Sequence, residues 1–482
     1  AVPTVHTNDA GIVDKVAANP DLTAKLVDRD TTGEADSPIP QIAGFSSRGP
    51  STAVGSDLLK PDLAAPGDGV LAGVSPINGG EEFGFLSGTS MAAPQVAGLG
   101  ALLLGKNPGW SPAAVKSPLM TTAADVVTED GAVNHDKFAP GAGEVAPERM
   151  ASPGLVSDAG VRDWAGFLQG SGVDLGLDPE DEIAARDVNV PSFALGSLVG
   201  EVSVTRTATA LRSGRYTASA DVPGVEVRVE PTVLDLDRGD QATFTVTFRN
   251  AGAAYGEFAM GELTWSGAGR TATSPVAVRP LAVRVPQSVS AGSAGAKGEA
   301  AIEVESGTDD PLAIEVAGLA KADALTGERT PDSGSISDTS PLMTYLTVPE
   351  GAPLARMGID AATEGSDWDL YVLTPAGEQL SSAGTGSEEQ ILINAPSAGM
   401  YMVVAHLYRG AEGSDRASAT LHSAAVPGDD VGNLQVDPDP LELSNGETGE
   451  VRARWNGLES GSWTGLVTFG GSAATALTVS VP

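Results

Sequence analysis

The chain has 482 residues, too many for one compact domain, so about three or four domains are expected. Asp and Glu number 63 against 28 Lys and Arg, which gives a net charge of −35 at pH 7. A surface this acidic repels nucleic-acid phosphates and anionic lipids, so neither a nucleic acid nor a membrane is expected as a partner. Cysteine is absent, which excludes disulfides and thiolate metal sites.

The amino-terminal third of the sequence mixes helical and extended patterns. Residues 1–28 are expected to form a strand, a helix and a second strand. A helix is expected from about Ser90 to Leu104, and its many Ala and Gly residues predict a helix packed tightly on every side. Ser111 and Pro112 are typical of an N-cap followed by a first-turn proline in the next helix. Pro118 is expected to kink or shorten that helix.

From about residue 187 the pattern becomes that of a β protein. Polar and apolar residues alternate with period two, and Gly, Asp and Pro turns separate the runs, as in "GEVSVTRTATAL" and "QATFTVTFRN". This pattern predicts β-sandwiches. We expect three blocks, at 187–285, 286–427 and 428–482.

The stretch "SGTSMAAPQVAG" at 87–98 presents a serine where a catalytic nucleophile is often mounted. Gly88 allows close backbone approach to a substrate. Ser90 falls at a helix N-terminus, where free N–H groups stabilise an oxyanion. An ordinary capped helix is the alternative interpretation of this motif alone. A serine also needs a base, and no histidine has catalytic surroundings. We expect each to be at the surface or hydrogen-bonded: His6, His135, His406 and His422.

Four motifs occur in an order that resembles the subtilisin-like serine proteases (subtilases): "FSSRGP", "LKPDLAAPG", "SGTSMAAPQVAG" and "WSPAAVKSPLMTTA". The resemblance implies that Ser90 is the catalytic nucleophile and that Gly88, Thr89 and Phe45 bind substrate. A core position in a strand is the alternative for Phe45. Gln95 stands where the family commonly has His, a position that the family uses structurally.

The resemblance also implies how the chain is organised. Residues 138–168 resemble the segment that closes the catalytic domain in the branch with a protease-associated insert, and residues 1–28 resemble the tail of that insert. Residues 29–172 would then be the carboxy-terminal half of an α/β catalytic domain, with a parallel sheet and helices. The expected fold class is therefore multidomain, with this partial α/β domain followed by all-β sandwich domains.

The two larger β blocks have resemblances of their own. "DVNVPSFAL" resembles the start of the fibronectin type III-like domain of the same protease branch, which assigns 187–285 to that domain. "SDWDLYVLTPAG" and "SAGMYMVVAHLY" resemble the pre-peptidase C-terminal sandwich of secreted bacterial peptidases, which assigns it 286–427. Residues 428–482 are expected to form a short β module.

The function implied by the resemblance is that of a secreted serine endopeptidase, which cleaves polypeptides through an acyl-enzyme on Ser90. In subtilases the catalytic Asp, the His and the oxyanion Asn precede the insert. An upstream half of the catalytic domain is therefore the expected partner, and this chain alone is expected to be inactive. The alternative is an extracellular β-sandwich binding or adhesion protein with an inactive subtilase remnant.

No cofactor or metal is expected. Asp367 and Asp369 alternate along one predicted strand and could offer carboxylate oxygens to Ca²⁺. Two carboxylates are too few for a calcium site, so we expect a solvated strand face instead.

Overall fold

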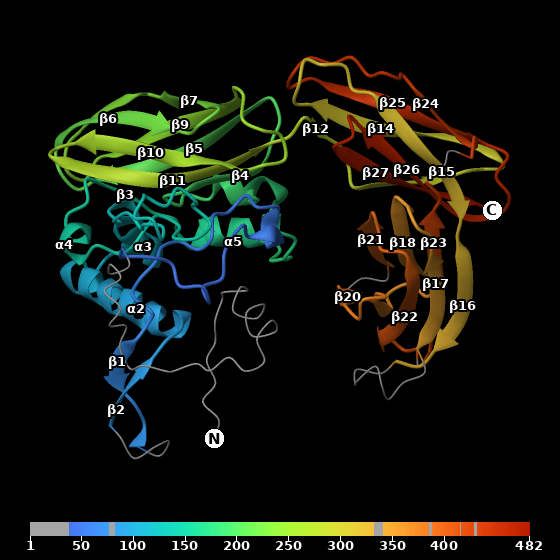
Figure 1. Ribbon diagram of the computed structural model, residues 1–482, viewed down its shortest axis with the longest axis horizontal. Coiled ribbons are helices and arrows are strands. Elements are labelled where there is room, and N and C mark those ends of the chain that lie inside the picture. Colours follow the sequence, from blue (N-terminus) through green and yellow to red (C-terminus); the bar gives the residue numbers. More distant parts are fainter. Residues whose placement is uncertain (1–37, 77–81, 332–340, 385–387, 415, 429–430) are drawn as a thin grey trace, which may run out of the picture.

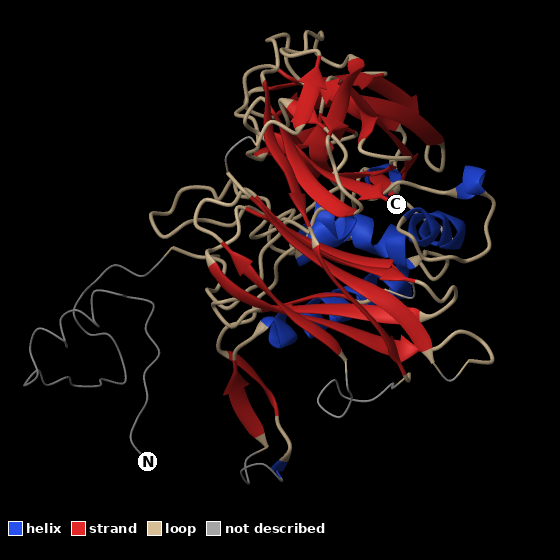
Figure 2. Ribbon diagram, turned by 90° about the vertical axis from the view of Figure 1, so that its right-hand side faces the viewer, coloured by secondary structure: helices blue, strands red, loops and turns tan. Residues whose placement is uncertain are grey.

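The computed structural model describes residues 38–76, 82–331, 341–384, 388–414, 416–428 and 431–482. The strands and helix expected at 1–28 lie outside the described residues. Helices gather in one region of the molecule and strands make up most of the rest (Figure 2). The helical part lies beneath a first sandwich, and a second group of sheets follows along the chain (Figure 1).

The helical part contains the 18-residue helix α2, several shorter helices and one small hairpin. Its strands β1 and β2 pair antiparallel, and the one parallel bridge described before residue 172 is the isolated pair Ala64 and Glu144. The expected parallel sheet is therefore not confirmed in the described residues. The elements are η1 (Thr52–Val54), β1 (Val70–Gly73), β2 (Phe83–Leu86), α2 (Thr89–Lys106), α3 (Pro112–Thr121), α4 (Pro147–Met150), β3 (Leu155–Ser157), α5 (Val161–Gly170), η3 (Pro179–Asp181) and η4 (Ala185–Asp187).

Helix α2 is packed on one face only. Its one buried residue is Leu103, which clusters with Leu119 of α3 and Met150 of α4. Leu102 and Leu104, on either side of Leu103 in the sequence, are 66% and 43% exposed. The expectation of a helix packed on every side is wrong, because α3 and α4 cover a single face of it.

Helix α3 follows the local sequence signals. Ser111 caps it, since its hydroxyl accepts a hydrogen bond from the Ala114 N–H at 3.0 Å, and Pro112 is its first residue. The N-cap prediction is confirmed. Pro118 lies inside the helix, which ends at Thr121, three residues later.

The first sandwich consists of a five-stranded sheet, β4-β11-β10-β6-β8, and a four-stranded sheet, β3-β5-β9-β7. Its core includes Phe244, Phe248 and Trp265. Since β3 is an edge strand of the second sheet, the sandwich begins before residue 187 and is joined to the helical part. The remaining strands are β4 (Phe193–Leu198), β5 (Glu201–Ala210), β6 (Gly214–Asp221), β7 (Val225–Glu230), β8 (Val233–Leu236), β9 (Gln241–Asn250), β10 (Ala259–Gly267) and β11 (Arg270–Pro280).

Arg206 of β5 holds residues 186–192, which precede β4, against this sandwich. We call these residues the connecting segment. The side chain is 3% exposed and lies 4.9 Å from the Phe193 ring centre. Its guanidinium donates to the carbonyl oxygens of Arg186, Val190 and Ser192 at 2.8 to 3.1 Å. Burial lowers the pKa of Arg206 to about 10, so the group is still charged at neutral pH and its hydrogen bonds are charge-assisted.

We predict that Arg206→Met destabilises the sandwich. The substitution would leave three carbonyl oxygens without their donor, at a cost of about 2–4 kcal/mol in the free energy of unfolding. Urea denaturation followed by tryptophan fluorescence measures this change. Arg228→Met is the matched control, because Arg228 forms an exposed ion pair with Glu201 and its loss should cost about 0–1 kcal/mol. Equal effects of the two variants would contradict the role given to Arg206.

The second sandwich is built from two separate stretches of the chain. Strand β14 pairs with β25 from Lys297 with Asn456 to Glu305 with Thr448, and β13 runs parallel to β27. One core joins both stretches. Its strands are β12 (Val283–Arg284), β13 (Ser288–Gly292), β14 (Lys297–Ser306), β15 (Ile314–Lys321), β24 (Leu434–Asp437), β25 (Thr448–Asn456), β26 (Gly461–Phe469) and β27 (Ala473–Val481).

A third sandwich, the inserted module, lies between β15 and β24 in the sequence. Its sheets are β16-β23-β18-β21 and β17-β22-β19-β20, around a core that includes Trp368. Its strands are β16 (Asp323–Arg329), β17 (Leu342–Val348), β18 (Leu354–Ala361), β19 (Asp367–Leu373), β20 (Gln379–Ser382), β21 (Glu388–Asn394), β22 (Gly399–Arg409) and β23 (Ala417–Val426).

These pairings differ from the expected division at residues 427 and 428. The segment 428–482 is not a separate module, because its strands share two sheets with β12 to β15. The expected block 286–427 likewise divides, since β12 to β15 belong to the second sandwich and β16 to β23 to the inserted module. The cause is long-range strand pairing, which period-two alternation does not specify.

We predict that the inserted module can be removed without unfolding the second sandwich. Asp323 at the start of β16 pairs with Ser423 near the end of β23, so the two ends of the module lie side by side. Replacing 323–426 by a short Gly-Ser linker should preserve a cooperative thermal transition of the remaining sandwich, measured by circular dichroism. Deleting 428–482 should abolish that transition, because it removes four of the eight strands. The reverse result would contradict the division.

Candidate active site around Ser90

Ser90 is the second residue of α2 and is exposed to solvent. Gly88 is the N-cap, with φ of +154°, a conformation that favours glycine. Thr89 begins the helix and is exposed as well. The first N–H groups of a helix have no intrahelical partners, so Ser90 stands where backbone donors are available to a developing negative charge.

A loop at 66–69 holds the turn before Ser90 in place. The Ser87 hydroxyl donates to Asp68 Oδ1 at 2.5 Å and accepts from the Gly69 N–H at 2.9 Å. The Gly88 N–H donates to the carbonyl oxygen of Gly67 at 2.8 Å. A Cβ on Gly67 would lie only 2.9 Å from the Gly88 carbonyl oxygen, so this close approach requires glycine. We call this set of contacts the Ser87 latch.

Gln95 adds a further contact to the same loop. Its side-chain amide donates to the Pro66 carbonyl oxygen, one turn along α2 from Ser90. The residue at this position therefore acts structurally in this chain, as the resemblance implies for the family position. Sequence reasoning did not find Asp68 or Ser87. The one sequence feature that could have indicated their contact is the presence of two short glycine-containing segments, "PGDG" and "SGTS".

We predict that the Ser87 latch restrains the backbone around Ser90. Ser87→Ala should increase amide hydrogen exchange at Gly69 and in the first turn of α2, because both bonds of the hydroxyl are lost. Hydrogen exchange with mass spectrometry measures this change. Ser87→Thr keeps the hydroxyl and is the matched control. Unchanged exchange in Ser87→Ala would show that the latch does not hold the turn.

Several large apolar side chains in the segments that precede Ser90 are exposed to solvent. Phe83, Phe85 and Leu86 of β2 and Leu71 of β1 are between 50% and 71% exposed. Phe45 is 50% exposed and lies in a turn, so the alternative of a core position in a strand is wrong. The β1–β2 hairpin, which ends four residues before Ser90, therefore presents apolar surface to solvent.

A charged cluster fixes the "KPD" segment behind the site. Asp62 accepts from Lys116 of α3 at 2.7 Å and from Lys60 at 2.8 Å. Burial lowers the pKa of the Lys116 ammonium from its ordinary 10.5, and the Asp62 carboxylate opposes that shift. The cluster joins the loop to α3 and does not reach the Ser90 hydroxyl.

The structure places no base beside Ser90. In the ranges that it describes, no side chain forms a hydrogen bond with the Ser90 hydroxyl. His135 is exposed, and His422 lies in the inserted module with Nε2 at 3.0 Å from Asp360 Oδ2. His406 is 3% exposed with no hydrogen-bond partner, so the expectation of a surface or satisfied residue is wrong there. His6 lies outside the described residues.

The two aspartates of β19 are not on a solvated face. Asp367 and Asp369 are 5% and 8% exposed, because β19 is an inner strand between β22 and β20. Asp369 accepts from Tyr371 at 3.2 Å and lies 3.7 Å from His406 Nδ1. The expectation of a solvated strand face is wrong. Among the described residues, no group of three or more acidic or histidine side chains could hold a metal ion.

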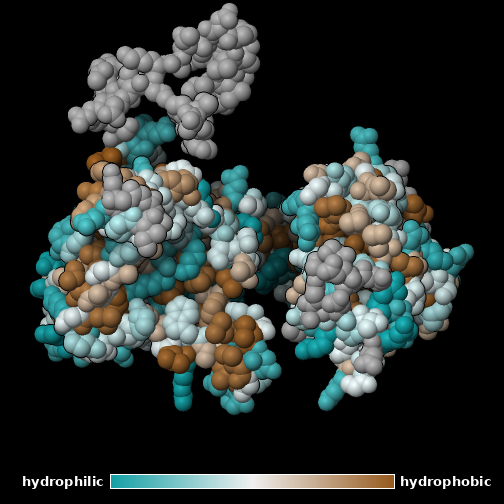
Figure 3. Space-filling view, turned by 90° about the horizontal axis from the view of Figure 1, so that it is seen from below, coloured by the Kyte–Doolittle hydropathy of each residue, from teal (hydrophilic) through white to brown (hydrophobic). Residues whose placement is uncertain are grey.

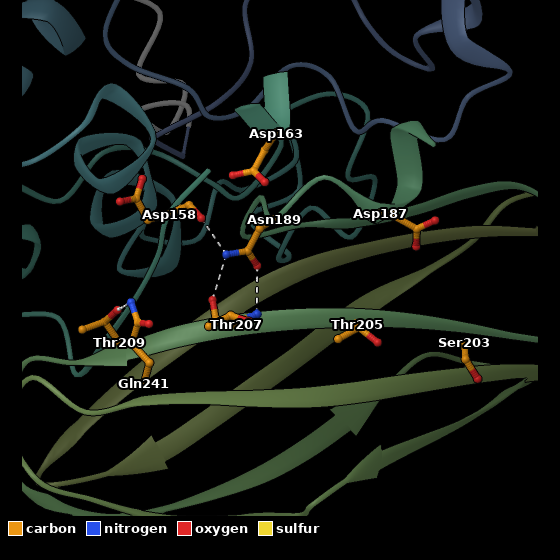
Figure 4. Close-up of a pocket in the computed structure, with 9 residues that line it drawn as sticks. All are labelled: Asp158, Asp163, Asp187, Asn189, Ser203, Thr205, Thr207, Thr209 and Gln241. Atoms are coloured by element: carbon orange, nitrogen blue, oxygen red, sulfur yellow. Dashed lines mark hydrogen bonds between the residues drawn. The ribbon is translucent and has the colours of Figure 1, made fainter. Parts of the chain in front are cut away.

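A polar pocket of about 550 Å³ lies away from Ser90, between β5 and the segment that contains α5 and η4 (Figure 4). The Asn189 amide spans it, donating to the carbonyl oxygens of Asp158 and Thr207 at 2.7 and 2.9 Å. Asp163 accepts from the Gly160 N–H at 2.5 Å. Asn189 thus connects the segment after β3 to β5, whereas the Asp163 contact caps α5 locally.

Comparison with known proteins assigns two segments of the chain. Residues 25–143, which contain Ser90, match the model of the Subtilase family. Residues 187–278 match the model of the Fibronectin type-III domain. Both resemblances are confirmed. The pre-peptidase C-terminal and protease-associated resemblances stay predictions.

Curated relatives agree with this assignment. The chain is 35% identical over 277 residues to Subtilisin-like protease SBT1.7 of Arabidopsis thaliana, and 36% identical over 274 residues to SBT3.15 of the same plant. These matches cover 50% and 52% of this chain and 36% of each relative, so the chain spans about a third of their length. The match to the solved structure of Tripeptidyl Peptidase 2 (TPP II) covers 72% of this chain and 28% of that one, at 16% identity and a TM-score of 0.23.

No helix in the described ranges is both long and apolar enough to cross a membrane.

Proposed function

We propose that this chain supplies the nucleophile and the carboxy-terminal domains of a secreted subtilisin-like serine endopeptidase. The observation that carries the proposal is the exposed Ser90 at the N-terminus of α2, inside the segment that matches the subtilase family. Its substrates would be polypeptides, with Gly88, Thr89 and Phe45 in contact with the bound chain.

In this proposal Ser90 Oγ attacks the scissile carbonyl carbon and becomes acylated. The N–H of Ser90, at the free start of α2, donates to the oxygen that gains negative charge. A base must take the proton of Ser90 Oγ, and the described residues place none there. We infer that the Asp, the His and the oxyanion Asn come from a preceding half of the catalytic domain, with 1–28 as the tail of an insert.

The apolar surface around Ser90 supports this inference. In the view from below, brown residues gather over the part of the molecule that carries α2 and the β1–β2 hairpin (Figure 3). Phe83 and Phe85 are 64% and 71% exposed, and burial of one such side chain is worth about 1.5–3 kcal/mol. We infer that a parallel sheet from the preceding half covers this surface.

The second function to test is that of an extracellular β-sandwich binding or adhesion protein, in which the segment around Ser90 is an inactive subtilase remnant. It is favoured by one observation, namely that β-sandwiches make up most of the described chain while Ser90 has no base beside it. The sequence that precedes Ala1 in the gene separates the two. An intact Asp, His and Asn set supports the protease, and a lesion in that set supports the binding protein.

We predict that the 482-residue chain alone hydrolyses no casein and does not label with a fluorophosphonate probe. Without a base the Ser90 hydroxyl stays protonated and attacks slowly. Labelling is followed by gel fluorescence, with a complete subtilisin as the positive control. Rapid labelling at Ser90 would show that this chain suffices for activation and would contradict the need for a preceding half.

We predict that Ser90→Ala abolishes proteolysis by the chain extended with its preceding half. Loss of the attacking atom should reduce kcat by about 10⁶, the scale known for a subtilisin nucleophile. Stability should change by at most about 1 kcal/mol, because one residue at a helix start is altered. Ser51→Ala is the matched control, since the Ser51 side chain makes no capping bond. Casein hydrolysis and the melting temperature report the two effects, and hydrolysis retained by Ser90→Ala would remove Ser90 from the mechanism.

A further inference from the structure

The outer face of one sheet of the inserted module carries a continuous apolar surface. Neighbouring strands bring their side chains into rows, since Met402 pairs with Tyr345 and with Leu373, and Val404 pairs with Met343 and Tyr371. We call this surface the Met-Tyr face. Its residues are Met343, Tyr345 and Thr347 of β17, Met400, Met402 and Val404 of β22, and Tyr371 and Leu373 of β19.

Four side chains of the Met-Tyr face are open to solvent. Met400, Tyr345, Met343 and Leu373 are 60%, 53%, 47% and 38% exposed. The module contacts the second sandwich through its other sheet, where Leu354 and Val426 cluster with Leu466 and Ala476. Val404 is buried beneath its neighbours, and Met402 and Tyr371 are half-buried. The four exposed side chains are left uncovered by the described residues, and an apolar patch of this kind indicates an interaction surface.

The charge around the Met-Tyr face limits what can bind there. None of its eight residues is charged, and two exposed carboxylates stand at the end with Met400 and Leu373. Glu350 follows β17, and Glu378 lies in the turn between β19 and β20. The whole chain carries a net charge of −35, so a second copy would be repelled, whereas a partner with Lys or Arg would be attracted.

The shape and composition of the face limit its occupant further. Small molecules bind in concave sites with convergent polar groups, whereas this is a sheet surface whose polar side-chain groups are the separate hydroxyls of Tyr345, Tyr371 and Thr347. Three of its eight residues are methionines, whose flexible and polarisable side chains adapt to varied apolar partners. A polypeptide segment with apolar and basic side chains fits all of these properties.

We propose that the Met-Tyr face docks apolar, basic segments of polypeptides. Apolar side chains of the segment would pack on Tyr345 and Met400, and its cations would lie near Glu350 and Glu378. This docking goes beyond the proposed function, because it requires neither Ser90 nor a complete catalytic domain. It can therefore be tested with the 482-residue chain itself.

The test is fluorescence anisotropy with the Ser90→Ala chain, in which no cleavage can occur. The probe is a fluorescein-labelled peptide of about 15 residues that repeats Leu-Ser-Lys, long enough to cross several strands. We expect saturable binding that is at least about tenfold weaker for the double variant Tyr345→Ser, Met400→Ser, since the two most exposed apolar anchors are lost. Val161→Ser, which changes an 87% exposed valine of α5, is the matched control and should bind as before.

Three results would overturn the proposal. They are equal affinity of the double variant and the control, equal binding of a peptide with Glu in place of Lys, and a concentration-dependent mass by sedimentation that the double variant abolishes. The last result would assign the Met-Tyr face to a second copy. Thermal unfolding checks that the variants are folded, and if the double variant is not, Met400→Ser alone replaces it. Because Ser90 is absent throughout, failure of docking leaves the proposed protease function untouched.

Discussion

Side chains on the outside of the first sandwich form joint cores with the helical part, and the position of Ser90 depends on them. Leu59 and Phe138 pack against Ala194 of β4 and Ala277 of β11. A second cluster joins α3 and α5 to the connecting segment that Arg206 holds. Since α2 buries a single residue, in the cluster that it shares with α3 and α4, its position depends on those two helices and on what holds them. The sandwich therefore provides the rigid base on which α2 is mounted.

The start of α2 is fixed by shorter-range contacts. The Ser87 latch and the Gln95 amide both act within the stretch from Pro66 to Gln95, and neither involves a residue outside it. The conformation around Ser90 is thus held by contacts within this one stretch of the chain. What the described residues do not provide is the environment that makes the hydroxyl reactive, namely a base and the exclusion of water.

The features that the sequence predicted are those with local physical causes. Ser111 and Pro112 begin α3 because capping depends on neighbouring backbone groups, and period-two runs form strands because alternation matches the pleat. The division at residue 428 was wrong because β14 pairs with β25 across the whole inserted module. The expectation that α2 is packed on every side was wrong for a related reason. Small residues make a helix packable, but they do not supply the surface that packs on it.

The pKa values of two aspartates in the inserted module also depend on contacts between distant strands, which the sequence does not specify. Burial raises the pKa of Asp367, whereas the hydrogen bond with His422 lowers that of Asp360. The two groups therefore act on stability with opposite signs. The contribution of Asp360 is present above its ordinary value of 3.8 and is lost as pH falls through its lowered folded-state value. The contribution of Asp367 is present below 3.8 and is lost as pH rises through its raised value, so its charge destabilises the fold at neutral pH. Asp360 lies on β18, which pairs with the strand that carries His422, whereas Asp367 is buried on the inner strand β19. Pairing between distant strands therefore sets the surroundings of both carboxylates.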